Sequence, residues 1–222
     1  MGMSGDKLTA IQWRILGVLA GIKPGWTLTG GAALAGFYLK HRVTKDLDLF
    51  WHGQDHLGDL PREIRDRLAA AGMEATVLQS GASFFQLRVS DGHNTCVVDL
   101  VADPVSTVVA PQQINLDGVL IAVDDPQEIL VNKLCALLGR AEIRDLVDVK
   151  ALLASGADLS RALAEAPQKD AGFSHLTLAW VLKDVRPKAL GHLAGLGPGE
   201  AQALEDFKEQ LVRDLLEAGS PE

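Results

Sequence analysis

The sequence has little of several features that would mark a special class of protein. Its 222 residues include only two cysteines, Cys96 and Cys135, and both stand inside apolar runs. Two buried free thiols are typical of a cytoplasmic protein and argue against a disulfide framework. No run of about 18 apolar residues occurs, and the N-terminus has no pattern of an export signal. The sequence therefore predicts a cytoplasmic protein without a membrane span.

The chain also lacks an excess of basic residues. Its net charge is −8, and the parts before and after Asp125 carry −4 each (10 basic and 14 acidic residues, then 11 and 15). Neither part is a general binder of polyanions, although a local basic patch could still contact a nucleic acid. The hydrophobic fraction of 47% and the charged fraction of 23% are those of an ordinary globular protein.

The first 125 residues mix helix and strand patterns. Apolar residues at helical spacing predict helices over residues 8–22, 32–39 and 60–71. Alternation and turn residues predict strands over residues 26–29, 46–51, 74–79, 84–90, 95–101 and 118–123. After Asp125 only helices are expected, over residues 126–138, 144–154, 159–166, 176–185 and 198–218. The pattern predicts an α+β domain, residues 1–125, and an all-helical C-terminal domain, residues 126–222.

Three aspartates on predicted strands require an explanation. Asp46 and Asp48 stand two apart, so they share one face of their strand, where like charges repel. Asp99 lies in the apolar run CVVDLVAD, where an unpaired charge is costly. Three carboxylates from adjacent strands that face Mg²⁺, with Mn²⁺ as an alternative, satisfy both conditions, because Mg²⁺ binds carboxylates together with water and substrate phosphates. The alternative is an edge strand with Asp46 and Asp48 in solvent.

A glycine pair precedes these aspartates. Gly30-Gly31 follows the short predicted strand that ends at Thr29 and opens a helix, where backbone N–H groups hold phosphates and a missing Cβ permits close approach. A tight strand-to-helix turn with no ligand is the alternative. The joint order of a strand, a Gly-Gly turn, a helix, Asp-x-Asp and a later aspartate favours a nucleotide site.

This stretch resembles the polymerase-beta-like nucleotidyltransferases, and within them the AbiEii/AbiGii toxin family. The family's first motif combines a Gly-Gly turn, a His-Arg pair before Ser or Thr, and an Asp-Leu-Asp strand. Here these residues are Gly30-Gly31, His41-Arg42, Thr44 and Asp46-Leu47-Asp48. The sequence departs from the family at Gly31 and Ala32, where a hydroxyl side chain is common, so Thr29 is the remaining hydroxyl near the phosphates.

The second motif is a lysine helix followed by Arg-Asp-x-x-Asp, which the family places across the cleft from the Asp-x-Asp strand. The matching residues are Lys133, Arg140, Arg144, Asp145 and Asp148. Their cations could hold triphosphate oxygens between the domains, and Asp145 or Asp148 could accept a proton from an attacking hydroxyl. The alternative is a salt-bridge network among Arg144, Asp145 and Asp148, with Lys133 extending its ammonium to solvent.

The resemblance implies an NTP-dependent nucleotidyltransferase. Asp46, Asp48 and Asp99 would bind the metal, with Asp99 also a candidate base. Nucleotide ligands would come from a larger set: Thr29, Gly30, Gly31, Arg42, Lys133, Arg140, Arg144 and Asp148. The expected role is the toxin of a toxin–antitoxin pair, acting on tRNA or another RNA, with an antitoxin as partner. Two alternatives stay open, a non-catalytic nucleotide-binding or scaffold protein and an enzyme that modifies an antibiotic or another small molecule.

Most histidines and tryptophans are expected to be structural. The histidines show no metal-ligand spacing and are assigned to surface or loop positions, among them His52. The four tryptophans, including Trp180, are assigned to the core rather than to a base-stacking surface.

Overall fold

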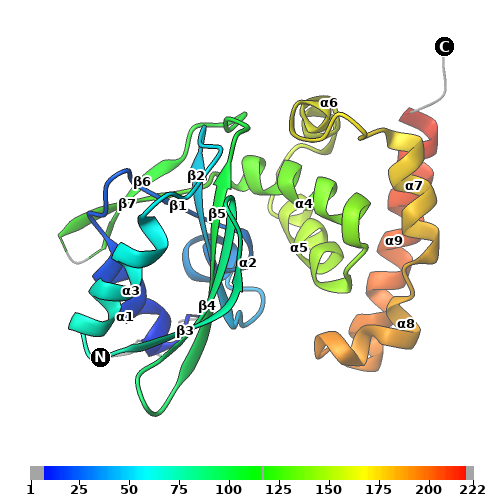
Figure 1. Ribbon diagram of the computed structural model, residues 1–222. Coiled ribbons are helices and arrows are strands. Elements are labelled where there is room, and N and C mark those ends of the chain that lie inside the picture. The colour runs from blue at the N-terminus through cyan, green and yellow to red at the C-terminus, as the bar shows by residue number, and fades with distance from the viewer. Residues whose placement is uncertain (1–7, 117, 219–222) are drawn as a thin grey trace. The chain divides into compact units, whose positions relative to one another are not determined.

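The computed structural model describes residues 8–116 and 118–218. The chain divides into two compact units between Asp125 and Pro126. Strands and helices mix in the first unit, and the described part of the second unit contains helices alone (Figure 1). The α+β prediction is therefore confirmed.

The first unit is built on a mixed sheet that has seven strands within the described residues, in the order β3-β4-β5-β2-β1-β7-β6. The strands are β1 (Thr27–Thr29), β2 (Asp46–His52), β3 (Glu74–Ser80), β4 (Phe84–Ser90), β5 (Thr95–Asp103), β6 (Gln112–Leu116) and β7 (Val119–Val123). The pairs β2–β5 and β1–β7 are parallel, and the other neighbours are antiparallel. Strand β2 thus lies in the middle of the sheet, between β5 and β1.

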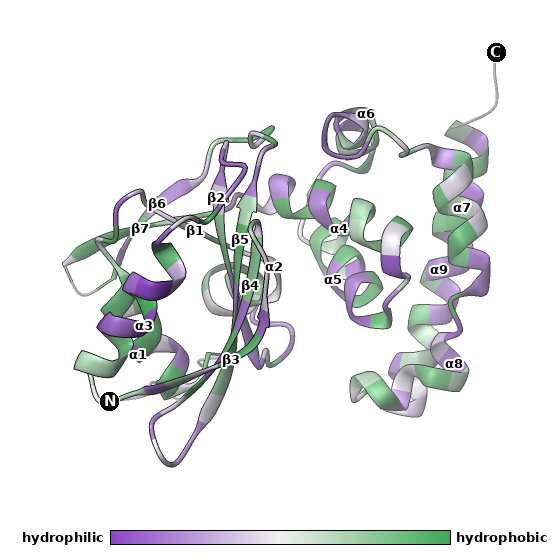
Figure 2. Cartoon of the chain, in the orientation of Figure 1, coloured by the Kyte–Doolittle hydropathy of each residue, from purple (hydrophilic) through white to green (hydrophobic). Residues whose placement is uncertain are grey.

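Strand β2 separates a buried face from a half-exposed face. Leu47, Leu49 and Trp51 are buried, and the alternate residues from Asp46 to His52 are half-buried. Strand β5 shows the same alternation. The strands are largely hydrophobic, as Figure 2 shows. One face of the sheet therefore forms the core, and the other carries the carboxylates.

The described part of the first unit also contains helices, one of which fixes the start of β2. They are α1 (Ala10–Leu19), α2 (Gly30–Ala33), the π-helical turn η1 (Leu34–Tyr38) and α3 (Leu60–Ala70). A capping box of Thr9 and Gln12 starts α1. The buried Gln12 amide then donates from Nε2 to the backbone oxygens of Asp46 (3.2 Å) and Thr44 (3.4 Å). These hydrogen bonds tie the backbone of Asp46, the first residue of β2, to α1.

The second unit is a bundle of helices. They are α4 (Pro126–Arg140), α5 (Ile143–Ala154), α6 (Leu159–Lys169), α7 (His175–Asp184), α8 (Pro187–Leu190), the 3₁₀ turn η2 (Gly191–Ala194) and α9 (Pro198–Ala218). Helix α4 packs on α5, α6 and α7, and α9 packs on α7 and α8. Hydrophilic and hydrophobic residues alternate along α9 (Figure 2). None of the helices in the described ranges has the length and apolar character needed to span a membrane.

Several predicted elements differ from the structure. Strand β6 was not expected, because its sequence QQINL lacks a clear alternation and lies at the sheet edge. Helix α4 continues through Gly139 to Arg140 and ends where Ala141 adopts a positive φ of 52°. The assignment of Trp180 to the core is wrong, because 69% of this residue is exposed on α7.

Candidate active site

The three strand aspartates lie on one face of the sheet. Asp48 and Asp99 are directly opposite each other on the parallel strands β2 and β5, and Asp46 precedes Asp48 by two residues. Paired residues of neighbouring strands are roughly 4.8 Å apart, so the carboxylates of Asp48 and Asp99 are close neighbours. The alternative of an edge strand is wrong, because β2 is central.

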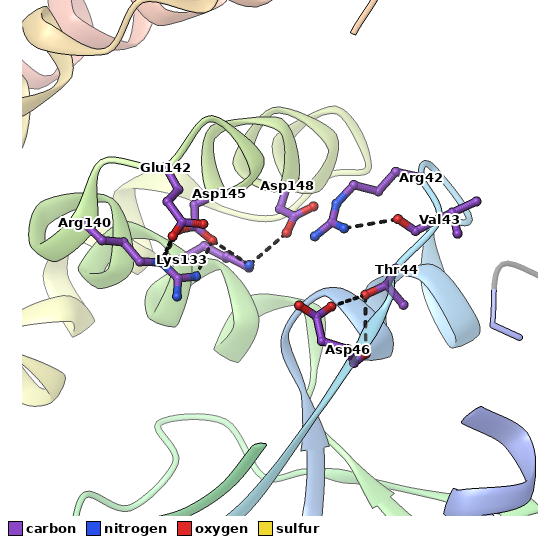
Figure 3. A network of polar contacts seen from close by, with 9 residues as sticks. All are labelled: Arg42, Val43, Thr44, Asp46, Lys133, Arg140, Glu142, Asp145 and Asp148. Atoms are coloured by element: carbon purple, nitrogen blue, oxygen red, sulfur yellow. Dashed lines mark hydrogen bonds and ion pairs between the residues drawn. The ribbon is translucent and has the colours of Figure 1, made fainter. Parts of the chain in front are cut away.

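Uncharged side chains orient two of these carboxylates. The hydroxyl of the buried Thr44 donates to Asp46 Oδ1 at 2.7 Å (Figure 3). The amide of Gln86, opposite Asp99 on β4, donates from Nε2 to Asp99 Oδ1 at 2.9 Å. Neutral donors fix a rotamer without cancelling the negative charge. These two hydrogen bonds therefore fix the orientation of both carboxylates on this face of the sheet.

The charge of this face affects the thiol behind it. Burial is the main cause that raises the pKa of Cys96 to about 12, and the charges of Asp46, Asp48 and Asp99 raise it further. A thiol with such a pKa is neutral near pH 7 and a poor nucleophile. Cys96 is therefore a structural residue, as its apolar sequence context predicted.

The glycine turn lies against Asp48. Gly30 has a positive φ of 63°, and a Cβ at this position would collide with Asp48 Oδ2. A Cβ on Gly31 would come within 2.6 Å of Arg42 Nη2. The guanidinium of Arg42 thus occupies the space that a serine side chain at Gly31 would need. This packing gives a physical reason for the missing hydroxyl.

The donor set suits a magnesium ion that is bound together with its substrate. Within the described ranges, no group of three or more His, Cys, Asp or Glu side chains is arranged to hold a metal ion by itself. Mg²⁺ is commonly held by one or two carboxylates plus substrate phosphates and water, so a complete protein cage is not required. Asp48 and Asp99, with Asp46 on the same face, fit this kind of site.

The second-motif residues form a buried network in the helical unit. Lys133 Nζ lies 2.7 Å from Asp145 Oδ1 and 2.9 Å from Asp148 Oδ2 (Figure 3). Arg140 donates to both oxygens of Asp145, from Nε at 2.8 Å and from Nη2 at 2.9 Å. Asp145 and Asp148 are almost completely buried, and Arg144 is exposed on α5. The alternative in which Lys133 extends its ammonium to solvent is wrong, because Lys133 contacts Asp145 and Asp148, and Arg140 is a second cation of the network.

This network stabilises charge in spite of burial. Burial alone disfavours the ammonium of Lys133, but Asp148 and Asp145 outweigh it and raise the lysine pKa. Burial likewise opposes the carboxylate of Asp145, but hydrogen bonds from Arg140 and the charge of Lys133 hold its pKa below the ordinary value. Lys133 and Asp145 are therefore charged at neutral pH.

A second charged cluster, which the sequence did not reveal, lies in the first unit. His52 Nδ1 is 3.2 Å from Asp103 Oδ2, and His52 Nε2 is 3.6 Å from Asp124 Oδ1. The assignment of His52 to a surface or loop position is wrong, because it stands on β2 with 12% of its side chain exposed. Burial would lower its pKa, but the two carboxylates raise it to about 9.

Comparison with known proteins identifies the family. Residues 14–219 match the model of the family described as nucleotidyl transferase AbiEii toxin, type IV toxin–antitoxin system. The chain belongs to the AbiEii nucleotidyltransferase toxin family. Its family membership makes it a nucleotidyltransferase, and the resemblance inferred from the two sequence motifs is confirmed. A search of the curated proteins finds no match.

Solved structures share the fold. JHP933 from Helicobacter pylori is 20% identical with a TM-score of 0.50, over 98% of this chain and 96% of that protein. A second H. pylori structure, described as a nucleotidyltransferase, is 20% identical with a TM-score of 0.51, over 96% of this chain and 100% of the other. MenT4, a nucleotidyltransferase toxin from Mycobacterium tuberculosis, is 18% identical with a TM-score of 0.50, over 79% of this chain and 64% of MenT4. These identities support the same fold and no finer comparison.

Proposed function

We propose that this AbiEii-family chain is a Mg²⁺-dependent enzyme that transfers a nucleoside monophosphate from an NTP to an RNA acceptor, and that it acts as the toxin of a toxin–antitoxin pair. The observation that carries the proposal is the pairing of Asp48 with Asp99 in register, with Asp46 on the same face and the Gly30 turn against Asp48. This arrangement brings oxygen ligands and an accessible backbone to one place.

The residues of the sheet unit would divide the chemistry among them. The acceptor hydroxyl oxygen forms a bond to the α-phosphorus, the bond from that phosphorus to the α–β bridging oxygen breaks, and pyrophosphate leaves with the bonding electrons. Asp99 would accept the hydroxyl proton, since Gln86 holds one of its oxygens and fixes the carboxylate plane. Bound Mg²⁺, held by Asp46, Asp48 and Asp99, would neutralise charge on the phosphates. Mn²⁺ has the same preference for carboxylate oxygens.

Phosphate contacts in the sheet unit would come from the turn that follows β1. The backbone of Gly30 is half-buried and would be the part of the turn that meets a phosphate, whereas Gly31 is buried. Thr29, which pairs with Asp48 across β1 and β2, would supply a hydroxyl. Arg42, whose guanidinium lies beside Gly31, would add a positive charge in place of a serine hydroxyl.

The motif cations of the helical unit could bind a phosphate only under a constraint. Lys133 already contacts two carboxylates, so a phosphate could take its ammonium only if Asp148 or Asp145 gave up that contact. Arg140 would have to give up hydrogen bonds to Asp145 in the same way, whereas Arg144 is exposed on α5. Asp145 contacts Lys133 and Arg140 and would orient both cations, and Asp148 would keep Lys133 charged.

Labelled nucleotides test the activity and the acceptor. We expect transfer of label from an α-³²P-labelled NTP to total RNA when Mg²⁺ is present, and none with EDTA. Asp48→Asn should lower transfer by about 10²-fold or more, because it removes a carboxylate charge that would hold Mg²⁺ in the transition state. Asp59→Asn is the matched control, since Asp59 is 89% exposed at the start of α3 and should leave transfer unchanged.

Four other results would contradict parts of the proposal. Label on a small molecule but not on RNA would make the chain a small-molecule nucleotidyltransferase. Calorimetric NTP binding without label on any acceptor would favour a non-catalytic binding protein, and full activity of Asp48→Asn would overturn the site. Growth inhibition that a neighbouring gene product does not relieve would contradict an antitoxin partner.

A further inference from the structure

The carboxylate face of the sheet continues into a row of apolar side chains. Asp48 pairs with Asp99, and Asp99 with Gln86, across β2, β5 and β4. Two residues further along the same strands, Phe50 pairs with Val101, and Val101 with Phe84. Because side chains two apart on a strand point to the same face, this second row stands next to the carboxylate row. On β1, Thr27 extends the row opposite Phe50.

The two phenylalanines of this row are not core residues. Phe50 and Phe84 are half-buried. Leu49 on β2 and Leu100 on β5, which point to the opposite face of the sheet, are completely buried. The ring of Phe50 lies 5.7 Å from the ring of His52 in a tilted arrangement. Both phenylalanine rings therefore keep part of their surface in contact with solvent, on the face of the sheet that carries the carboxylates.

We propose that Phe50 and Phe84 form the stacking surface for the base of the donor NTP. The inference rests on the proposed function, because it takes the α-phosphate to lie at Asp48 and Asp99. The apolar row is roughly 7 Å beyond the carboxylate row, since a strand rises about 3.4 Å per residue. A ribose joins a phosphate to its base over a span of this order.

The chemistry of the row fits a base better than a phosphate. The row offers no positive charge to a phosphate, because none of its side chains is charged: Thr27, Phe50, Val101 and Phe84. A phenylalanine ring stacks on the flat face of any base and makes no hydrogen bonds that would select one. The donor base is favoured over the acceptor base, because the glycine turn and Asp48 are in contact and together define where the donor phosphates bind.

Binding measurements with two ligands isolate the base. Tripolyphosphate carries the phosphates of an NTP without its base. For Phe50→Leu and Phe84→Leu, we expect the Kd for ATP, with Mg²⁺, to rise roughly tenfold, in keeping with the loss of one stacking contact. The Kd for tripolyphosphate should stay unchanged. Phe85→Leu is the matched control: Phe85 is also half-buried on β4 but pairs with Leu100 on the opposite face, and its variant should change neither Kd.

A gain-of-signal variant protects the test against a folding defect. In Phe84→Trp the added indole should stack on the base, so ATP should quench the added fluorescence and tripolyphosphate should not. ATP affinity that is unchanged in both leucine variants would overturn the stacking surface while the proposed function stands. A higher KM for RNA with normal ATP affinity would assign the row to the acceptor and also overturn it. If the unaltered protein bound neither ligand, the proposed function itself would fail.

Discussion

Two groups of carboxylates in this molecule are built in opposite ways. On the sheet, Asp46 and Asp99 accept hydrogen bonds from the neutral Thr44 and Gln86 and are half-buried. In the helical unit, Asp145 and Asp148 are buried and contact the cations of Lys133 and Arg140. The first group accepts hydrogen bonds from neutral side chains near solvent, and the second is paired with cations away from solvent.

The difference separates chemistry from stability. Water can solvate a half-exposed carboxylate when no metal ion is bound. Such a residue can therefore serve as a metal ligand at little cost in the free energy of unfolding. A buried ion network tolerates no loss of a single member, since the remaining charge has no solvent to stabilise it. Substitutions on the sheet face should therefore act on activity, and substitutions in the network should act on folding first.

Removal of the central cation of the network should give the largest effect. Lys133→Met leaves Asp145 and Asp148 in the interior without their shared ammonium, and we expect a loss of about 3–5 kcal/mol in the free energy of unfolding. Urea unfolding followed by circular dichroism measures the change.

A compensating variant distinguishes uncompensated charge from lost packing. Adding Asp148→Asn to Lys133→Met removes one of the two carboxylates that lose the lysine ammonium and should recover part of the lost stability. No recovery would indicate that packing of the lysine stem, not charge, dominates at this position. The sheet aspartates offer the contrast, since Asp48→Asn should leave the unfolding free energy within about 1 kcal/mol.

The sheet unit has a charged cluster of its own around His52, and its contribution to stability depends on pH. The pKa of His52 rises from 6.5 to about 9 on folding, so its contribution to stability is fully present below pH 6.5 and is lost as the pH rises through about 9. The shift corresponds to roughly 3 kcal/mol at most. Thermal unfolding between pH 6 and pH 10 should show this loss, and His52→Asn should flatten the profile. An equal pH dependence in His52→Asn would exclude His52 as its cause.

The sequence predicted the parts of the site that depend on local pattern. Alternation placed Asp46 and Asp48 on one face, and the turn residues Gly30-Gly31 marked the strand-to-helix junction. The register of β2 against β5, which sets Asp48 opposite Asp99, depends on long-range pairing and could not be derived from spacing. For the same reason Gln86 was missed, since only pairing with β5 places its amide at Asp99.

Other differences arise from tertiary contacts. Gln12 carried a usable signal, because it is a polar residue at a buried position of an apolar helix, and such a residue needs a hydrogen-bond partner. His52 carried no such signal, because Asp103 and Asp124 are distant in sequence. The fold class was predictable because a region that mixes strands with helices is followed by a region of helices alone. The edge strand β6 packs too little apolar surface to show a pattern.

The glycine turn connects activity with backbone strain. Gly30→Ala would place a Cβ against Asp48 Oδ2 at a positive φ, which costs about 1–2 kcal/mol in stability and displaces the carboxylate. We expect a larger loss of transfer than of stability, measured by labelling and by urea unfolding. Gly53→Ala is the control, since Gly53 also has a positive φ but a Cβ there contacts nothing within 4 Å. Equal activity losses in the two variants would remove the contact with Asp48 as the reason.

The smallest expected effect on stability concerns Thr44. Thr44→Val keeps the shape of the buried side chain and removes the hydroxyl that donates to Asp46 Oδ1. Because Asp46 is half-exposed, water can replace part of this bond, so the stability loss should be about 1 kcal/mol. Activity should fall further than stability, with a raised Mg²⁺ requirement, since Asp46 would lose the orientation of its carboxylate. Thr44→Ser restores the hydroxyl and should restore the Mg²⁺ requirement, and a Thr44→Val variant with an unchanged Mg²⁺ titration would show that Asp46 needs no such support.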